Sequence, residues 1–361
     1  AAGASIQSLA GSGGGRNLNA KLDNPGTITV AQAMTTNKGS VAHTNSGLIN
    51  LTTGNYTIII SGTTPSFTTT GTINVPTGRT LTLQGGVAGG AAQHFNYNAG
   101  TMGGAGTVAL LNSQLNVNQP LHTASTHLTG TNSTLAGSDT LYADGGTTTL
   151  TGCTVAGMVV ATTGSILNEN CDWTGWLYLH GGATVEWRGT NTSNGYYMGP
   201  GSISRVIGTV GVNASLTFGG SQGNAGLLEL TSSGAATAAT VTTSSAPGQG
   251  FFNGPTGEIR SSAGSGGVRQ LFTYLDNQGL VDLQASTTLN RASVAHRNRG
   301  TVQVASGKIL TVTGASFTND TTGVLTGGGT ITMNGATTFA QRGTIRPGGP
   351  QGTLTLNGAC P

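Results

Sequence analysis

The fold is decided by a short pattern that begins as FNGPTGEI at residues 252–259 and then recurs towards the C-terminus. Each copy holds Asn, a short gap, Gly and an apolar strand; the later copies are LDNQGLV (275–281), HRNRGTV (296–302), FTNDTTGV (317–324) and FAQRGTI (339–345), where Asn is lost. The glycines at 257, 279, 300, 323 and 343 are separated by 22, 21, 23 and 20 residues. A steady period with changing side chains is typical of stacked structural repeats.

This period predicts an all-β protein, a right-handed parallel β-helix (β-solenoid) with about 22 residues per turn. Alternating segments such as TLTL at 80–83 and KILTV at 308–312 place apolar side chains on an inner face and Thr on an outer face. We expect Gly to permit tight corners between the faces. We expect Asn to form ladders at successive corners, because it tolerates left-handed backbone and can stack on itself.

The composition is consistent with this fold. Of the 361 residues, 62 are Gly, 35% are hydrophobic and only 7% are charged, whereas ordinary soluble domains have roughly 25% charged residues. Identical charges on successive turns would lie about 4.8 Å apart, so a repetitive solenoid is expected to avoid charged residues. The apolar fraction and the net charge of +3 also exclude a chain that is disordered because it is highly charged.

The repeats divide the chain into segments of different regularity. The parallel β-helix is predicted to cover residues 46–361, with less regular turns in 46–249 and regular repeats in 250–358. Four Gly-Thr/Ser-apolar triplets in the less regular part are expected to be corners, and they begin at Gly71, Gly106, Gly164 and Gly208. Residues 1–45 show no good strand pattern, so we predict an N-terminal cap or arm, because the end of a solenoid exposes strand edges.

Basic residues are sparse. The densest group contains Arg291, His296, Arg297 and Arg299, and we interpret it as a solvated loop. Binding of nucleic acid requires a concentrated basic stripe, so we expect no nucleic acid among the partners.

Two features bear on location. No run of 18 apolar residues is present, so no membrane span is predicted. The sequence starts with the small residues Ala1-Ala2-Gly3-Ala4-Ser5 and no Met, which suits a mature N-terminus after removal of a signal peptide. We therefore expect a secreted, extracellular protein at the cell surface.

Three cysteines are present. Cys153 and Cys171 lie 18 residues apart, close to one solenoid turn, so we expect them on neighbouring turns. They then form a disulfide, as in an oxidising compartment, or are two small buried residues. Cys360 is left over, as an unpaired thiol or an intermolecular link.

A candidate glycan-binding site surrounds the three tryptophans of the chain, in residues 172–197. Its five proposed side chains are Trp173, Trp176, Tyr178, Glu186 and Trp187. Aromatic faces beside hydrogen-bonding groups suit sugar recognition, and the alternative is that these rings stack on an outer face or inside a widened turn. Strand alternation places Trp173 and Trp176 on opposite faces.

The same segment offers two carboxylates. Asp172 and Glu186 would serve as acid and base in a polysaccharide-degrading site if they lay about 5–9 Å apart. The Gly-rich stretches at 11–15 and 85–90 lack the Gly-Lys-Ser/Thr ending of phosphate loops, and the sequence has no nucleophile elbow. We therefore predict a protein that is not an enzyme.

No motif indicates a metal site or a cofactor. Asp139, Asp144, Glu169 and Asp172 are candidate oxygen ligands for calcium, but no Asp-x-Asp-x-Asp or Gly-Gly-x-Gly-x-Asp repeat accompanies them. The cysteines and histidines do not have metal-ligand spacing. We predict no cofactor, with calcium as the one ion considered.

Two Gly- and Thr-rich segments lie near the C-terminus, LTGGGTIT (325–332) and GTIRPGGPQGTLTLNG (343–358). They resemble the Gly-Thr-Leu/Ile-x-Pro-Gly and Pro-Gly-Thr-Leu-Thr-Leu/Val-Asn-Gly turns of autotransporter passenger domains and related bacterial β-helical surface proteins. Gln351 departs from that pattern, where the family often has Ser-Pro. The resemblance implies a β-helix used for surface display, adhesion or matrix building, and it implies no particular activity.

These observations favour a secreted bacterial cell-surface protein with a structural or adhesive role. We expect it to self-associate, into fibres or a surface layer, and glycans or a host or cell surface are the other partners considered. The alternative is a polysaccharide-binding or polysaccharide-degrading β-helix whose site lies around residues 172–197.

Overall fold

The computed structural model describes residues 3–86, 93–244, 249–348 and 352–358. These residues form β-strands joined by turns, and none of them lies in a helix. The strands pair in parallel and stack as a β-solenoid of about 15 turns with about 22 residues in each. The prediction of an all-β solenoid with this period is therefore confirmed. The chain divides into two compact units, Ala1–Trp176 (unit 1) and Leu177–Pro361 (unit 2).

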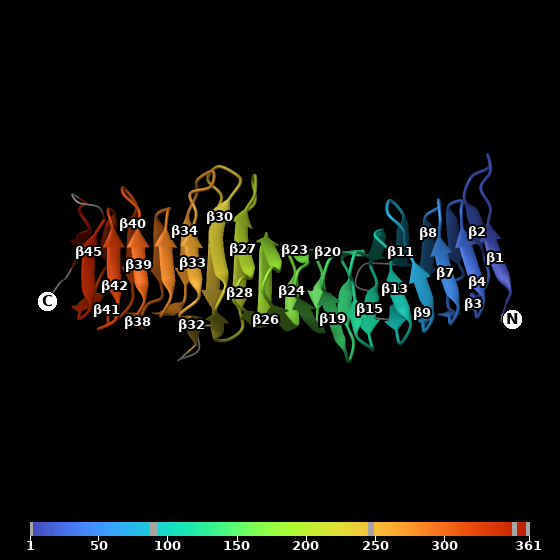
Figure 1. Ribbon diagram of the computed structural model, residues 1–361, viewed down its shortest axis with the longest axis horizontal. Coiled ribbons are helices and arrows are strands. Elements are labelled where there is room, and N and C mark those ends of the chain that lie inside the picture. The colour runs from blue at the N-terminus through green and yellow to red at the C-terminus, as the bar shows by residue number, and fades with distance from the viewer. Residues whose placement is uncertain (1–2, 87–92, 245–248, 349–351, 359–361) are drawn as a thin grey trace. The chain divides into compact units, whose positions relative to one another are not determined.

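Unit 1 arranges its strands in parallel stacks (Figure 1). One stack contains β1 (Ser5–Ser8), β4 (Thr27–Val30), β7 (Leu48–Leu51), β10 (Thr72–Asn74) and β13 (Thr101–Gly103). A second contains β2 (Arg16–Leu18), β5 (Met34–Asn37), β8 (Tyr56–Ile60), β11 (Thr80–Gly85), β14 (Thr107–Leu111), β17 (His127–Thr131), β20 (Thr147–Thr151) and β23 (Ser165–Glu169). The others contain β3 (Asp23–Asn24), β6 (Ala42–Asn45), β9 (Ser66–Thr69), β12 (His94–Tyr97), β15 (Gln114–Val117), β18 (Thr134–Ala136) and β21 (Thr154–Val155), and then β16 (Leu121–His122), β19 (Thr140–Ala143) and β22 (Met158–Ala161).

Unit 2 repeats the arrangement, and β24 (Asp172–Leu179) runs across the boundary between the units. One stack contains β25 (Thr184–Arg188), β27 (Ile203–Gly208), β30 (Leu227–Ser232), β33 (Glu258–Ser261), β36 (Leu280–Leu283), β39 (Thr301–Val304), β42 (Val324–Gly327) and β45 (Thr344–Pro347). The long strand β26 (Thr190–Met198) then begins two stacks. Its first half leads to β28 (Ala214–Phe218), β31 (Ala239–Thr243), β34 (Arg269–Phe272), β37 (Thr287–Asn290), β40 (Ile309–Thr313), β43 (Thr330–Met333) and β46 (Thr355–Asn357). Its second half leads to β29 (Gln222–Asn224), β32 (Gly250–Asn253), β35 (Tyr274–Asn277), β38 (Ala295–Asn298), β41 (Ser316–Asn319) and β44 (Thr338–Gln341).

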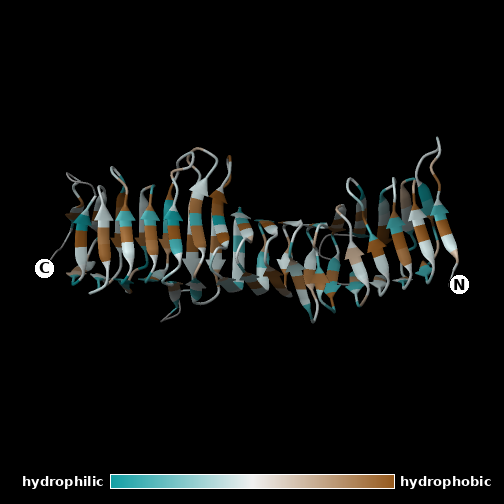
Figure 2. Cartoon of the chain, viewed as in Figure 1, coloured by the Kyte–Doolittle hydropathy of each residue, from teal (hydrophilic) through white to brown (hydrophobic). Residues whose placement is uncertain are grey.

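The core of each unit follows from strand alternation. In β8, for example, Tyr56, Ile58 and Ile60 are fully buried, and the two residues between them are partly exposed. Figure 2 shows the same alternation as brown and pale bands along the strands. Equivalent positions then stack from turn to turn: Phe317 of β41 and Phe339 of β44 are in register, and their rings lie 6.1 Å apart in the core of unit 2. Stacking therefore buries a continuous apolar interior although each strand is short.

The repeated glycines are needed because consecutive turns approach closely. A Cβ atom on Gly279 would lie 2.1 Å from the carbonyl oxygen of Gly257, and one on Gly300 would lie 2.2 Å from that of Gly279. None of these three glycines has the left-handed backbone that only Gly adopts easily. The expected tight corner is therefore present, but lack of room for a side chain, and not backbone freedom, selects Gly there.

A buried asparagine ladder follows these corners in unit 2. The side-chain amide of Asn253 donates to Asn277 at 2.7 Å, Asn277 donates to Asn298 at 2.7 Å, and Asn298 donates to Asn319 at 2.8 Å. The ladder ends on Gln341, whose Oε1 accepts from Asn319 at 3.1 Å. The predicted Asn ladder is confirmed, and its last member is the repeat in which Asn is lost.

The N-terminal segment differs from expectation. Residues 1–45, predicted as a cap or arm without good strands, contain β1 to β6, and these pair in register with the following strands. Asn24 and Asn45 even begin an asparagine ladder with a 2.7 Å hydrogen bond. An arm without strands is therefore wrong for the described residues, whereas a capping role for the first turn stays a prediction.

The predicted corners of the less regular part are correct in three cases. Gly71, Gly106 and Gly164 directly precede β10, β14 and β23. Gly208 instead ends β27, and the following Val210 is 82% exposed. The apolar residue lies at the tip of a loop and not on an inner face, so the fourth corner is wrong.

In the part of the chain that the structure describes, no helix is long and apolar enough to cross a membrane.

Candidate functional site

Two of the three tryptophans proposed for glycan binding are core residues. Trp173 is 1% exposed and its indole donates to Asn168 at 3.3 Å, whereas Trp187 is fully buried and donates to Ser204 at 3.0 Å. Rings at these positions cannot stack on an external sugar. Any glycan site in this region is therefore formed without them.

The third tryptophan and the nearby tyrosine of β24 face outward. Trp176 is 52% exposed, and Tyr178 is partly exposed two residues further along the same strand. The alternation of β24 is regular, so Trp173 and Trp176 lie on opposite faces, as predicted.

In unit 2 an aromatic cluster forms around Tyr197. This side chain is 41% exposed, and its ring centroid lies 6.2 Å from that of Tyr178 and 6.5 Å from the imidazole of His180. The adjacent Tyr196 is buried against Trp187, and burial raises its pKa above the usual value. Strand alternation alone could not predict which of the two tyrosines is exposed. Gly195 and Tyr196 are consecutive residues of β26 and both are buried, so the alternation of buried and exposed positions is interrupted there.

Glu186 is a member of a ladder of ion pairs on the outside of unit 2. Its carboxylate lies 2.8 Å from Arg188 and 3.5 Å from Arg205. The register aligns Glu186, Arg205, Glu229, Arg260 and Asp282 on five successive strands. The sign of the charge therefore alternates from strand to strand along the stack. Contrary to the expectation from composition, a solenoid does not need to avoid charged residues in general; it needs to avoid like charges at neighbouring positions.

The ladder fixes the charge states of its central members. Burial of Glu229 acts to raise its pKa, but hydrogen bonds from Ser262 and from Arg205, at 2.7 Å, outweigh it and leave the pKa lowered. The pKa of Arg205 is raised: burial opposes its charge, and Glu229 and Glu186 favour it. A carboxylate held in such a network, as Glu186 is, is a structural charge; the geometry gives no reason to assign it an acid–base step with Asp172, which lies in unit 1.

The proposed calcium ligands have other partners. Asp144 pairs with His122 at 2.6 Å and accepts the backbone N–H of Ala124 at 2.7 Å. Asp139 accepts the backbone N–H of Thr140 at 2.8 Å. Within the described ranges, no three or more His, Cys, Asp or Glu side chains come together as a metal site would require.

Cys153 and Cys171 occupy equivalent positions on neighbouring turns of unit 1, each directly before a strand of the same stack. Both are buried, and the backbone N–H of Asp172 donates to the carbonyl of Cys153 at 2.9 Å. Hydrogen bonding between the two thiols lowers the pKa of Cys153 and raises that of Cys171. The placement on neighbouring turns is confirmed, and the disulfide stays a prediction. Cys360 lies outside the described residues.

The basic group is not a solvated loop. His296 is fully buried on β38, with Nδ1 accepting the backbone N–H of Leu275 at 3.3 Å. Burial lowers its pKa to about 4. Arg297 pairs with Asp320, and Arg299, directly after the strand, pairs with Asp276. The sequence interpretation failed because His296 and Arg297 lie on a strand, and because the charges of Arg297 and Arg299 are neutralised by carboxylates of neighbouring turns.

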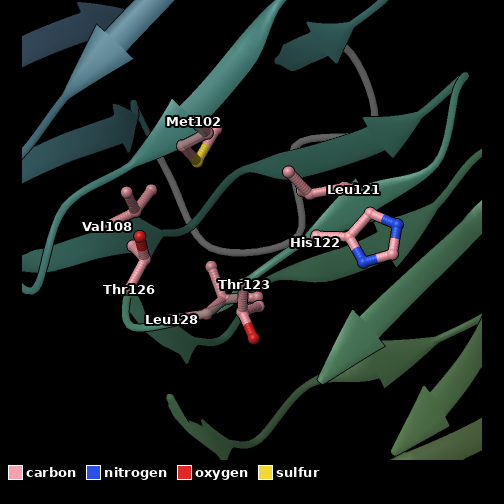
Figure 3. Close-up of a pocket in the computed structure, with 7 residues that line it drawn as sticks. All are labelled: Met102, Val108, Leu121, His122, Thr123, Thr126 and Leu128. Carbon is pink, nitrogen blue, oxygen red and sulfur yellow. The ribbon is translucent and has the colours of Figure 1, made fainter. Parts of the chain in front are cut away.

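A small, partly open pocket of about 10 Å³ lies in unit 1 (Figure 3). Its lining is apolar except for the edges contributed by His122, Thr123 and Thr126, and Figure 3 shows the imidazole of His122 extending away from it. The volume is at the lower limit for one water molecule. This pocket therefore cannot hold an organic ligand.

Comparisons of the chain with known protein families, with curated proteins and with solved structures give no match.

Proposed function

We propose that the protein is a secreted bacterial cell-surface protein with a structural or adhesive role. The observation that carries this proposal is the repetition of uncharged outward positions on in-register turns. Thr288, Thr311 and Thr332, for example, stack on β37, β40 and β43, and all three face outward between buried positions. A face of this kind suits contact with extended partners more than it suits a reaction.

Self-association is part of the proposal. Outward sheet faces without repulsive charge allow copies to pack face to face. The central charges of unit 2 are already paired within the ladder from Glu186 to Asp282. Fibres or a surface layer would be the products.

The resemblance to autotransporter passenger domains supports the same role. The two segments that carry it supply β42, β43, β45 and β46, which belong to the stacks of unit 2. Residues 349–351, including Gln351, lie outside the described residues.

The proposal is tested by negative-stain electron microscopy and sedimentation of the purified chain over a range of concentrations. We expect filaments or layers, and a sedimentation coefficient that rises with concentration. Isolated particles at the highest concentration would contradict self-association. Protease treatment of intact source cells tests location: the chain should be degraded while a cytosolic marker is protected, and equal protection of both would contradict surface exposure.

Polysaccharide binding is the second candidate. The exposed cluster of Tyr178, His180 and Tyr197 favours it. Degradation of polysaccharide is not favoured, because Glu186 is engaged by two arginines. If Glu186→Gln abolished a hydrolytic or lytic activity of the purified chain, Glu186 would have a catalytic role and would not be only a structural charge.

A further inference from the structure

Aromatic side chains gather on the outside of unit 2 along the second half of β26 and the strands β29, β32 and β35 that follow it in register. Tyr197 is 41% exposed and Phe252 is 37% exposed. Each has a second ring beside it: Tyr178 lies 6.2 Å from Tyr197, and Tyr274 lies 6.0 Å from Phe252, between centroids. Large exposed rings are unusual on a monomeric surface and mark contact with a partner when they cluster.

Strand register joins the two groups into one aromatic row, which we define as Tyr197, Gly223 and Phe252. These residues face each other on the consecutive strands β26, β29 and β32. A Cβ atom on Gly223 would meet nothing within 4 Å, so the position between the rings is open. Two strand spacings separate the rings by about 10 Å, a span suited to a short stretch of a linear polymer.

The charged side chains that follow the aromatic row on the next two strands are paired with residues of opposite charge. Asp276 and Arg297 follow Phe252 in register. Arg299 binds Asp276 through both carboxylate oxygens, and Arg297 pairs with Asp320. Two acidic and two basic side chains are thereby neutralised by each other, so the row presents no surplus charge to a polyanion or a polycation.

Two hollows lie at the corner that follows these strands. One, of about 250 Å³, is lined by Ser202, Thr256 and Glu258 among others, and the second, of about 370 Å³, includes Gln278 and Thr322. Small-molecule sites occupy about 300–1,000 Å³, so the first hollow is slightly smaller than this range and the second lies near its lower end. The hydroxyl, amide and carboxylate groups that line these hollows can form hydrogen bonds with a polyhydroxylated ligand.

We propose that the aromatic row of unit 2 binds a neutral polysaccharide, whose chain runs along the stacking direction with sugar faces against Tyr197 and Phe252. This inference rests on the adhesive part of the proposed function and names its partner class. The balanced charges favour a neutral glycan over nucleic acid or polyuronate. Gly223 is a specificity-determining position, because its missing side chain leaves room for the polymer between the rings.

Affinity electrophoresis of the full chain tests the proposal. Native gels contain hydroxyethyl cellulose, galactomannan or a soluble β-1,3-glucan as neutral probes, and polygalacturonate or double-stranded DNA as anionic probes. We expect retardation by at least one neutral probe. Tyr197→Ala/Phe252→Ala should weaken that binding about 100-fold, at about tenfold for each ring. Gly223→Trp should cause a similar loss by filling the gap, whereas Phe252→Tyr should retain binding.

Val268→Ala is the matched control, because Val268 is 49% exposed in the same unit but outside the row; it should bind within twofold of the wild type. Circular dichroism checks that each variant is folded, and the surface positions give no reason for unfolding. Three results would overturn the inference: no retardation by any neutral probe, retardation by anionic probes only, or equal binding by the double variant. Loss of self-association instead of glycan binding in the double variant would also overturn it, since the row would then be an interface between copies.

Failure of this inference is separable from failure of the proposed function. Electron microscopy without polysaccharide reports self-association of the same wild-type sample. Filaments without glycan binding refute only the inference, and glycan binding without filaments refutes only the assembly part of the proposed function.

Discussion

Asn277 provides the sharpest test of what holds the turns of unit 2 together. It is fully buried, donates to Asn298 at 2.7 Å and to the carbonyl of Thr301 at 3.1 Å, and accepts from Asn253 at 2.7 Å. Asn277→Leu keeps the approximate volume of the side chain and removes all three hydrogen bonds. The acceptor oxygen of Asn298, itself fully buried, is then left without its ladder donor.

The expected cost follows from these contacts. A typical intramolecular hydrogen bond contributes about 1 kcal/mol net, and a buried group that loses its partner costs about 1–3 kcal/mol. We therefore expect Asn277→Leu to lower the local free energy of opening by about 3 kcal/mol, with Asn277→Ala at least as damaging because it also leaves a void. Because solenoid repeats unfold in parts, a single global midpoint would underestimate the effect.

Native-state hydrogen exchange measures the effect directly. Amides of β35 and β38 should exchange about 100-fold faster in Asn277→Leu, which is the rate equivalent of about 3 kcal/mol. The control is Gln278→Ala: Gln278 is the next residue and has an exposed side chain, and its replacement should change exchange by less than about 0.5 kcal/mol. If Asn277→Leu exchanged like this control, the ladder would not stabilise the stack and the reasoning would be refuted.

Three further predictions concern other contacts of the fold. Burial lowers the pKa of His296 from the ordinary value of 6.5 to about 4. Between these two values the unfolded chain binds a proton that the folded chain does not, so His296 should lower the free energy of unfolding by about 3 kcal/mol as pH drops from 6.5 to 4. Urea unfolding of His296→Gln should lack this contribution to the pH dependence, and an unchanged pH dependence would contradict the assignment. Gly279→Ala should prevent stable local stacking because its Cβ would lie 2.1 Å from a backbone oxygen, whereas the Cβ of Gly223→Ala meets nothing within 4 Å. Amide hydrogen exchange near residue 279 should therefore accelerate strongly in the first variant, and exchange near residue 223 should stay unchanged in the second; equal changes in both would refute the steric account. Arg205→Glu, placed in register between Glu186 and Glu229, should cost about 2 kcal/mol at low salt and less at high salt, and a cost independent of salt would argue against the charge ladder.

The period and the corner chemistry could be predicted from sequence because they recur in consecutive copies. The Asn-to-Gly pattern places Asn277 and Gly279 at one corner of every turn, and both roles are physical consequences of stacking. The N-terminal turns were missed although a signal was present: AHTNSG at 42–47 repeats AHRNRG at 295–300. His43 and His296 are both fully buried, and each accepts a backbone N–H through Nδ1. Variable loop lengths between the copies hid the correspondence.

The candidate site was only partly predictable. Alternation separated Trp173 from Trp176, because β24 is regular. It could not place Tyr196 and Tyr197, because the alternation of β26 breaks between them. The pairing of Glu186 with Arg205 and the alignment of Tyr197 with Phe252 depend on the register between turns, and loops of different length between strands leave that register undetermined by sequence.

Register is the central claim, and a double-cysteine experiment in unit 2 measures it most directly. Thr288 faces Thr311 on the next strand, and Thr311 faces Thr332 on the one after. Neighbouring strands lie about 4.8 Å apart, within the range of Cα separations of about 4.4–6.8 Å that a disulfide requires, whereas residues two strands apart are about 10 Å apart. Under mild oxidation, mass spectrometry should find a disulfide between the introduced cysteines of Thr288→Cys/Thr311→Cys and none in Thr288→Cys/Thr332→Cys. Cross-linking of the second pair, or no cross-linking of the first, would contradict the in-register parallel solenoid.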